Sequence, residues 1–342
     1  PARARDRFEQ WCVQNLPSGC VVAMEACSGA HHWARTLGRL GFVPLLIPPH
    51  LVTPFRLAGK RGKNDANDAA AIYEASLRPG IHPVAVKTPE QQAVLLAHSV
   101  RGGAVRERTA WVNRIRGTLA EFGVVVPQGI EQLRRALPVL LDRSDLGLPD
   151  LARRLLRTAL EHWATLDALV EQAEAPIGEH ARTDPRARLI AQLHGIGPIG
   201  ASAVVAHIGD AREFGSARQP SAWLGVVPSQ HSSGGKARLG GITKHGQPEL
   251  RTLLVTGARS AVQTAHLRDD RISRWLTELR ERAGWQKACV ALVNKNLRIA
   301  WAILNRGECF DPNHVPAMPK AKAKPELRHR QAAPAGAAGA AA

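Results

Sequence analysis

The chain has 342 residues, enough to bury a large core, and its length predicts two or three domains. Its 46 Lys and Arg residues against 29 Asp and Glu residues give a net charge of +17, which favours polyanionic partners because each neutralised phosphate releases counterions. The absence of any long apolar run excludes a membrane-spanning protein, and five cysteines without a CxxC pair predict reduced thiols in a cytoplasmic protein.

The first 85 residues alternate between helix-like and strand-like segments. A helix is predicted over residues 5–16, followed by a short apolar strand over residues 20–26. A second helix is predicted over residues 28–40, and a second strand over residues 43–47. This alternation predicts an α/β layer whose strands are at least partly parallel.

A helix predicted to begin at Asn64 or Asp65, with Asn64 as its cap, carries two carboxylates. Asp65 and Asp68 stand three residues apart and therefore share a face. Glu25 ends the first strand and is expected to lie beside this helix as a third ligand. Mg²⁺ suits so sparse a carboxylate set, and two such ions stabilise both oxygens in phosphodiester cleavage. The alternative is that both aspartates are solvated first-turn carboxylates, favoured by the helix dipole.

The pattern changes to long helices from Thr88 to about Gly178, with arginines between the periodic apolar residues. A break at residues 123–129 is followed by helical stretches over residues 130–141 and 148–174. Helices of this length predict a hairpin that projects from the core and suits dimerisation. An ordinary helical bundle is the alternative.

Residues 183–305 are predicted to be mostly helical, and they include a glycine-containing turn. Residues 193–200 read Leu-His-Gly-Ile-Gly-Pro-Ile-Gly, which is typical of a helix-hairpin-helix turn. Gly195 and Gly197 are expected to bring backbone N–H groups close to a phosphate at a helix N-terminus. A tight turn between two packed helices is the alternative.

A Gly-rich insertion at residues 228–246 holds two adjacent serines, Ser232 and Ser233. Glycine freedom beside them would let a hydroxyl reach a phosphorus in line, while Lys236, Arg238 and Lys244 would neutralise the developing charge. The insertion is not a Walker A loop, because the GxxxxGK[ST] spacing fails. A flexible linker, or a loop that only binds a nucleic-acid backbone, is the alternative.

These motifs, in this order, resemble the transposases of the insertion sequence 110 family, particularly its 1111 subgroup. The resemblance covers about residues 21–305 and is carried by segments 22–29, 63–69, 113–117, 121–123, 193–197, 223–228, 232–235 and 241–244. It implies a RuvC-type, RNase H-like domain, then a coiled-coil segment, then a C-terminal transposase domain. The expected fold class is therefore α/β plus all-α. The corresponding ranges are 1–87, 88–182 and 183–310, followed by a Pro-, Ala- and Lys-rich tail at 311–342 that is expected to be disordered.

The resemblance also implies the roles of particular residues. The acidic site of the family follows an Asp-Glu-Asp-Asp pattern, so Glu25, Asp65 and Asp68 would be its second, third and fourth members and hold Mg²⁺. A serine would attack DNA and form a covalent phosphoserine link; we place it at Ser233, with Ser232 as the fallback. Nucleic acid would contact the basic and glycine residues of these motifs, namely Arg114, Arg116, Gly195, Gly197, Lys236, Arg238 and Lys244.

The partners implied by the resemblance are donor and target DNA, a structured guide RNA that pairs with both, and further copies of the chain. Active sites would be composite, so a nucleoid-associated homodimer or higher oligomer is expected. The first family aspartate has no match: Asp6, the only candidate before Glu25, lies in a predicted helix. The first strands of the RNase H-like sheet are therefore expected to be absent, through truncation or a wrongly assigned start.

Two other functions are also compatible with the sequence. One is a metal-dependent junction nuclease that uses the carboxylates alone and forms no covalent link. The other is a catalytically inactive nucleic-acid-binding remnant, which the unmatched first aspartate favours.

Overall fold

The computed structural model describes residues 7–56, 64–234, 236–307 and 309–314. Asp6 and most of the expected tail, residues 315–342, lie outside the described residues. No helix within these ranges is long and apolar enough to cross a membrane.

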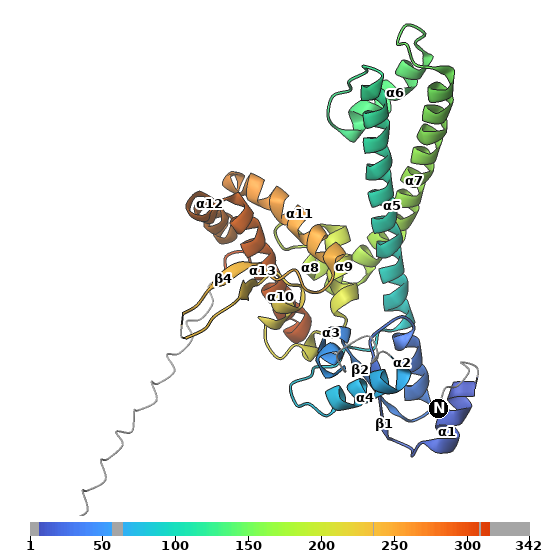
Figure 1. Ribbon diagram of the computed structural model, residues 1–342. Helices are drawn as coiled ribbons and strands as arrows, with labels where there is room; N and C mark the ends of the chain where they lie inside the picture. The colour runs from blue at the N-terminus through green and yellow to red at the C-terminus, as the bar shows by residue number, and fades with distance from the viewer. Residues whose placement is uncertain (1–6, 57–63, 235, 308, 315–342) are drawn as a thin grey trace, which may run out of the picture.

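A small α/β unit forms the N-terminal part of the molecule (blue in Figure 1). Strands β1 (Val21–Glu25) and β2 (Val43–Ile47) are parallel, with Glu25 opposite Ile47. Helix α2 (Ala30–Arg39) connects them, so the predicted alternation is confirmed. The remaining segments are α1 (Phe8–Asn15), α3 (Pro49–Val52), the 3-10 turn η2 (Thr53–Phe55) and α4 (Asp65–Ser76).

Helix α4 packs on the sheet and places the acidic motif next to the end of β1. Ala71 and Ala75 of α4 are buried against Ile47 of β2. The helix begins where the sequence predicts, because the Asn64 side chain accepts a hydrogen bond of 2.8 Å from the backbone N–H of Asn67. The cap therefore fixes which residues form the first turn, and with them the position of Asp68.

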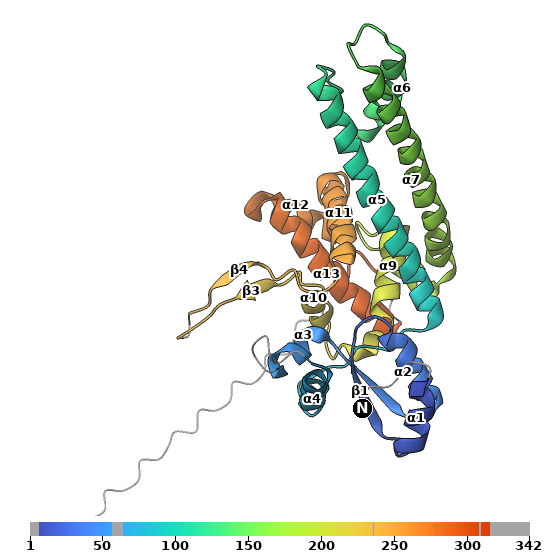
Figure 2. The same cartoon turned by 45° about the vertical axis from the view of Figure 1, so that its right-hand side comes forward.

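Two long helices, α5 (Pro89–Glu121) and α7 (Asp150–Thr183), form an antiparallel arm that projects from the body (Figures 1 and 2). At 1.5 Å per residue each helix is about 50 Å long. Helix α6 (Ile130–Asp142) packs at the far end of the arm. Helix α7 continues beyond the predicted end at residue 174, because Ile177 and Ala181 keep its buried face apolar.

The C-terminal unit is helical and has the largest core of the described chain. Helix α9 is buried from Ala201 to Ala206, and the Trp301 indole of α13 donates a 3.0 Å hydrogen bond to the Phe214 carbonyl. Its segments are α8 (Pro185–Ile190), α9 (Pro198–Ile208), η4 (Ala211–Glu213), α10 (Gln219–Trp223), α11 (Pro248–Thr264), η5 (Ala265–Leu267), α12 (Arg271–Ala283) and α13 (Trp285–Arg306).

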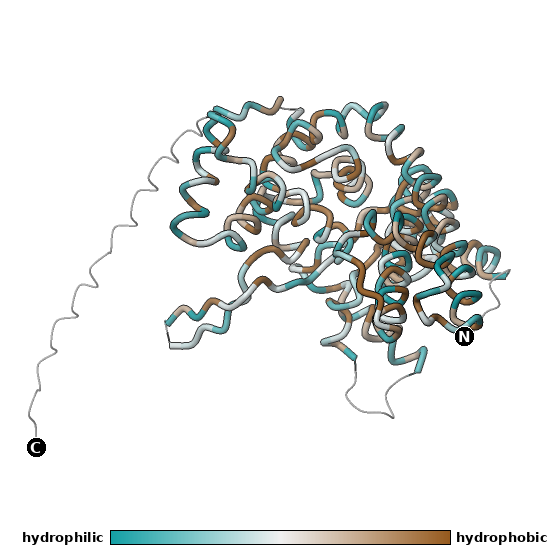
Figure 3. Tube along the Cα trace, turned by 90° about the horizontal axis from the view of Figure 1, so that it is seen from above, coloured by the Kyte–Doolittle hydropathy of each residue, from teal (hydrophilic) through white to brown (hydrophobic). Residues whose placement is uncertain are grey.

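The Gly-rich insertion is a β-hairpin, not a flexible linker. Strands β3 (Pro228–Gln230) and β4 (Leu239–Ile242) pair antiparallel and extend away from the rest of the molecule in every view (Figures 1–3). Its root is packed backbone to backbone. A Cβ on Gly225 (φ +73°) would lie 2.3 Å from the His245 nitrogen, and one on Gly246 would lie 2.1 Å from the Trp223 oxygen. Only glycine fits at these two positions.

Candidate functional site

Arg56 joins two of the predicted site carboxylates. Its guanidinium lies 2.6 Å from the Glu25 carboxylate at the end of β1 and 3.0 Å from the Asp68 carboxylate in the first turn of α4. All three side chains are partly exposed. The fold therefore brings Glu25 and Asp68 to one cation, which is an arginine, and the Mg²⁺ site at these carboxylates stays a prediction.

The third predicted carboxylate, Asp65, lies exposed in the same first turn of α4. Within the described residues, no three His, Cys, Asp or Glu side chains are arranged to hold a metal ion. Glu25 and Asp68 nevertheless fit a hard cation, because both carboxylates already converge on a single positive group. Arg56 was missed by the sequence analysis, since no local pattern links it to Glu25.

The hairpin holds its two serines differently. The Ser232 hydroxyl accepts hydrogen bonds from the Gln230 amide at 2.8 Å and from the Arg238 backbone N–H at 3.2 Å. The backbone of Ser233 pairs with Lys236 across the turn. Its side chain is exposed, and its hydroxyl makes no hydrogen bond to the described residues. Ser232 therefore supports the hairpin, whereas Ser233 presents its hydroxyl to solvent.

The three predicted cations of this segment lie on or beside the hairpin and are exposed. Lys236 lies opposite Ser233 and Arg238 opposite Ser232 across the turn, while Lys244 lies at the root with a left-handed backbone (φ 58°). Its N–H donates a 3.0 Å hydrogen bond to the Gly225 carbonyl, which holds this uncommon conformation. The hairpin is thus a basic projection with a serine near its end.

The serine and the acidic site lie apart within one chain. In Figures 1 and 2 the β3–β4 hairpin points away from the unit that contains β1 and α4. Glu25 and Asp68 come together through Arg56, but Ser233 does not join them. A reaction that uses both sites therefore needs a rearrangement or a second copy of the chain.

The turn at residues 193–197 is packed tightly against α11. Gly195 has φ +77°, and a Cβ placed on Gly257 of α11 would lie 1.9 Å from the Gly195 carbonyl oxygen. Gly197, which caps α9, is exposed, and nothing lies within 4 Å of a Cβ added at this position. The packed-turn interpretation therefore explains Gly195, and a phosphate contact remains a prediction for both glycines.

His194 connects this turn to the start of α12. The His194 Nε2 lies 3.0 Å from the Asp270 carboxylate, and the Asn296 side-chain amide donates a 2.9 Å hydrogen bond to the His194 backbone carbonyl. Asp270 also caps α12 by accepting hydrogen bonds from Ile272 and Ser273. Although burial opposes it, the hydrogen bonds from Ser273 and His194 lower the pKa of Asp270 to about 2. This partly buried contact fixes the turn relative to α12 and α13.

The two predicted arginines of the arm make contacts within the protein. The Arg116 guanidinium donates hydrogen bonds to the carbonyls of Val126 at 2.8 Å and Gly129 at 2.6 Å, which holds the loop after α5. Arg114 is exposed and stacks over Trp111 at 5.0 Å. Nucleic-acid contact by these two side chains stays a prediction.

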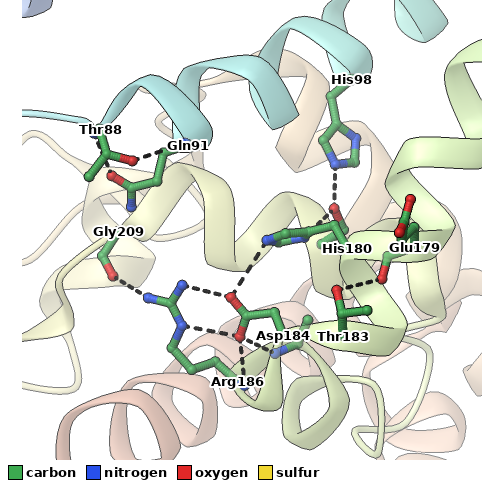
Figure 4. Close-up of polar contacts among 11 residues, drawn as sticks. Thr88, Gln91, His98, Glu179, His180, Thr183, Asp184, Arg186 and Gly209 are labelled. Atoms are coloured by element: carbon green, nitrogen blue, oxygen red, sulfur yellow. Dashed lines mark hydrogen bonds and ion pairs between the residues drawn. The ribbon is translucent and has the colours of Figure 1, made fainter.

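A buried serine, Ser202, lies between His98 and His180 where the arm meets α9; Figure 4 labels the two histidines. Ser202 Oγ is 2.9 Å from His98 Nε2 and 3.0 Å from His180 Nδ1, and His180 Nε2 lies 3.6 Å from Asp184. The order serine, histidine, aspartate is that of a serine hydrolase triad, but the ring nitrogens are exchanged, because Ser202 lies at Nδ1 of His180 and Asp184 at Nε2. Ser202 is fully buried and His98 is 6% exposed, so no substrate reaches the hydroxyl. The network therefore joins α5, α7 and α9 structurally.

Acid is expected to destabilise this junction. Burial, then the nearby His207, Arg101 and His180, lower the pKa of His98 to about 4. The unfolded chain binds this proton near pH 6.5, so the stabilisation is present above that pH and is lost as the pH falls toward 4. Urea unfolding should show about 2 kcal/mol less stability at pH 5 than at pH 7 from this group. His98→Gln should flatten that dependence; an unchanged slope in the variant would contradict the assignment.

The chain is similar in sequence to known transposases. Residues 187–272 match the profile described as "Transposase IS116/IS110/IS902 family". A "Probable family 20 transposase" of Pseudomonas aeruginosa is 46% identical over 312 residues, covering 91% of this chain and 90% of the relative. The "Transposase for insertion sequence element IS1111A" of Coxiella burnetii is 40% identical, over 87% of this chain and 81% of the relative.

A third relative, the "Transposase for insertion sequence element IS1328" of Yersinia enterocolitica, is 38% identical over 85% of both chains. The chain is therefore a transposase, a protein that acts on DNA. It belongs to the IS116/IS110/IS902 family of transposases.

Proposed function

We propose that this transposase cuts and rejoins the DNA of its insertion sequence by attack of Ser233 on the scissile phosphate. The observation that carries this proposal is the exposed Ser233 hydroxyl on a basic hairpin, beside a Ser232 hydroxyl that is already hydrogen-bonded. A nucleophile must be accessible, and the hydrogen-bonded neighbouring serine anchors the turn and so keeps the nucleophile in position.

In the proposed step, Ser233 Oγ forms a bond to phosphorus while the bond from phosphorus to one deoxyribose oxygen breaks. The serine hydroxyl loses its proton, and the leaving deoxyribose oxygen takes one up. A DNA hydroxyl that later attacks the phosphoserine restores the serine and rejoins the strand. Lys236 and Arg238, exposed on the same hairpin, balance the charge on the phosphate during both steps.

Glu25, Asp68 and Asp65 would hold Mg²⁺ in this proposal, on an α/β unit interpreted as RuvC-type. When bound, Mg²⁺ stabilises charge that develops on phosphate oxygens. Arg56 occupies the position between Glu25 and Asp68, where its single positive charge balances one of the two negative charges. The guanidinium and a metal ion therefore compete for the same oxygens.

This competition gives a metal-binding test. Arg56→Gln should bind Mn²⁺, measured by electron paramagnetic resonance titration, about tenfold more tightly than the wild type, because a competing charged hydrogen bond is gone. Asp68→Asn should weaken binding. Arg143→Gln, which removes the same charge from an exposed pair with Asp145 on the arm, should leave Mn²⁺ binding unchanged. Equal affinities for Arg56→Gln and the wild type would argue against a metal at these carboxylates.

The separation of hairpin and acidic site within one chain supports a composite active site built from two protomers. We therefore infer a homodimer or higher oligomer on DNA. The net charge of +17 leaves ample capacity for a structured guide RNA as well. The guide RNA rests on the family resemblance alone.

Protein attached covalently to DNA, recovered after denaturation, tests the proposed function. The adduct is expected when the chain is expressed together with its own insertion sequence. Free DNA ends without protein would instead indicate a metal-dependent nuclease. Nucleic-acid binding that falls steeply with salt, without any cleavage, would indicate an inactive remnant.

A further inference from the structure

A large groove lies between the root of the hairpin and helices α12 and α13. It has a volume of about 1190 Å³ and includes Pro228 and Gly240 of the hairpin strands in its wall. This exceeds the roughly 300–1,000 Å³ of a small-molecule pocket, so its size suits a segment of a polymer. None of the predicted site residues lines it.

The groove carries strong positive charge. Five cations line it among the described residues, Arg271, Lys287, Lys295, Arg298 and Arg306, against one carboxylate, Asp311. Burial, and then repulsion by Arg271 and Arg298, lowers the pKa of Lys295. An excess of cations in one groove favours the binding of an anion between them.

The floor of the groove is apolar and aromatic. Ile272, Trp301 and Ile303 are nearly buried at its base, and Phe310 also lines it. Lys295 Nζ lies over the Trp275 ring, 4.3 Å from its centre, so a cation and an aromatic ring adjoin in the groove and the ammonium covers one face of the ring. Aromatic side chains next to cations bind nucleic acid by stacking on bases while the cations contact phosphates.

We propose that this groove binds an unpaired segment of nucleic acid, with bases toward the apolar floor and phosphates at Lys295 and Arg298. In a duplex the base faces are stacked on one another, so an apolar floor favours a single strand. This inference rests on the proposed function and adds to it a site for the strand that leaves the hairpin. The tail of the chain is a poor occupant, because its Lys320, Lys322 and Lys324 carry the same charge as the groove.

Fluorescence anisotropy with a labelled 12-nucleotide oligothymidine and a 12-base-pair duplex tests the groove. The full chain carrying Ser233→Ala is used, so that no covalent step contributes. Adding Lys295→Gln and Arg298→Gln together should weaken single-strand binding at least tenfold. It should also reduce the slope of log K against log salt by about 1.4, since each of two lost contacts contributes roughly 0.7.

Arg280→Gln with Arg282→Gln is the matched control, because it removes the same charge from exposed positions of α12 outside the groove. We expect that pair to weaken binding by less than threefold. Equal losses for the two pairs, or an equal loss on the duplex, would overturn the groove assignment. Melting curves like that of the parent chain show that both pairs are folded.

Photocrosslinking with 5-iodouracil in the oligothymidine gives a second, independent readout. Crosslinks are expected on the peptide containing Trp275, and crosslinks confined to other peptides would contradict the proposal. Different outcomes would reject the proposed groove binding and the proposed serine step. A covalent adduct formed by a chain with an intact Ser233 but no groove binding would reject only the groove. Groove binding without an adduct would reject only the serine step.

Discussion

Ser233→Ala is expected to abolish the covalent link between protein and DNA, with recombination falling by roughly 10³-fold or more. The Ser233 Oγ is the only heavy atom lost, and this oxygen makes no hydrogen bond to the described residues. The hairpin should therefore keep its shape. The measurement is the amount of DNA retained on protein after denaturation, together with polymerase chain reaction across the junction of excised circles.

Ser232→Ala is the control on the same turn. Its hydroxyl accepts hydrogen bonds from Gln230 and from the backbone N–H of Arg238, so its loss should loosen the hairpin by about 1 kcal/mol. We expect reduced yield but a persistent adduct. An adduct that persists in Ser233→Ala and disappears in Ser232→Ala would exchange the two roles, and loss in neither variant would exclude both serines.

Gly257→Ala is expected to destabilise the C-terminal unit by about 3 kcal/mol. An alanine Cβ at this position would lie 1.9 Å from the carbonyl oxygen of Gly195, which is backbone that cannot rotate away. The turn at residues 193–197 would have to move from α11, and with it the contact of His194 with Asp270. Calorimetric melting, together with DNA binding, measures both consequences.

Gly178→Ala provides the matched comparison. This residue lies inside α7, and nothing lies within 4 Å of the Cβ that alanine would add. Alanine has the higher helix propensity, so this variant should be neutral or up to about 1 kcal/mol more stable. If both variants were equally stable, the close approach of Gly257 to Gly195 would not constrain the turn.

Local sequence signals located much of the N-terminal unit. The alternating apolar runs predicted β1 and β2, and the Asn64 cap predicted the start of α4, because caps and strand periodicity act within a few residues. The same reasoning left the Gly-rich insertion open between a linker and a loop. Its hairpin is held by contacts of Gly225 and Gly246 across the root, which no local pattern encodes.

The sequence by itself determined the family, the acidic helix turn that carries Asp65 and Asp68, and the pair of serines, because these are short motifs whose chemistry is local. Tertiary structure alone decided that Arg56 joins Glu25 to Asp68, because Arg56 lies 31 residues after Glu25 in the chain. It also decided that the Ser232 hydroxyl accepts hydrogen bonds within the hairpin, and that the groove gathers Arg271 and Lys295 beneath the hairpin. Such contacts depend on how distant segments pack, and hydrophobic periodicity does not specify that packing.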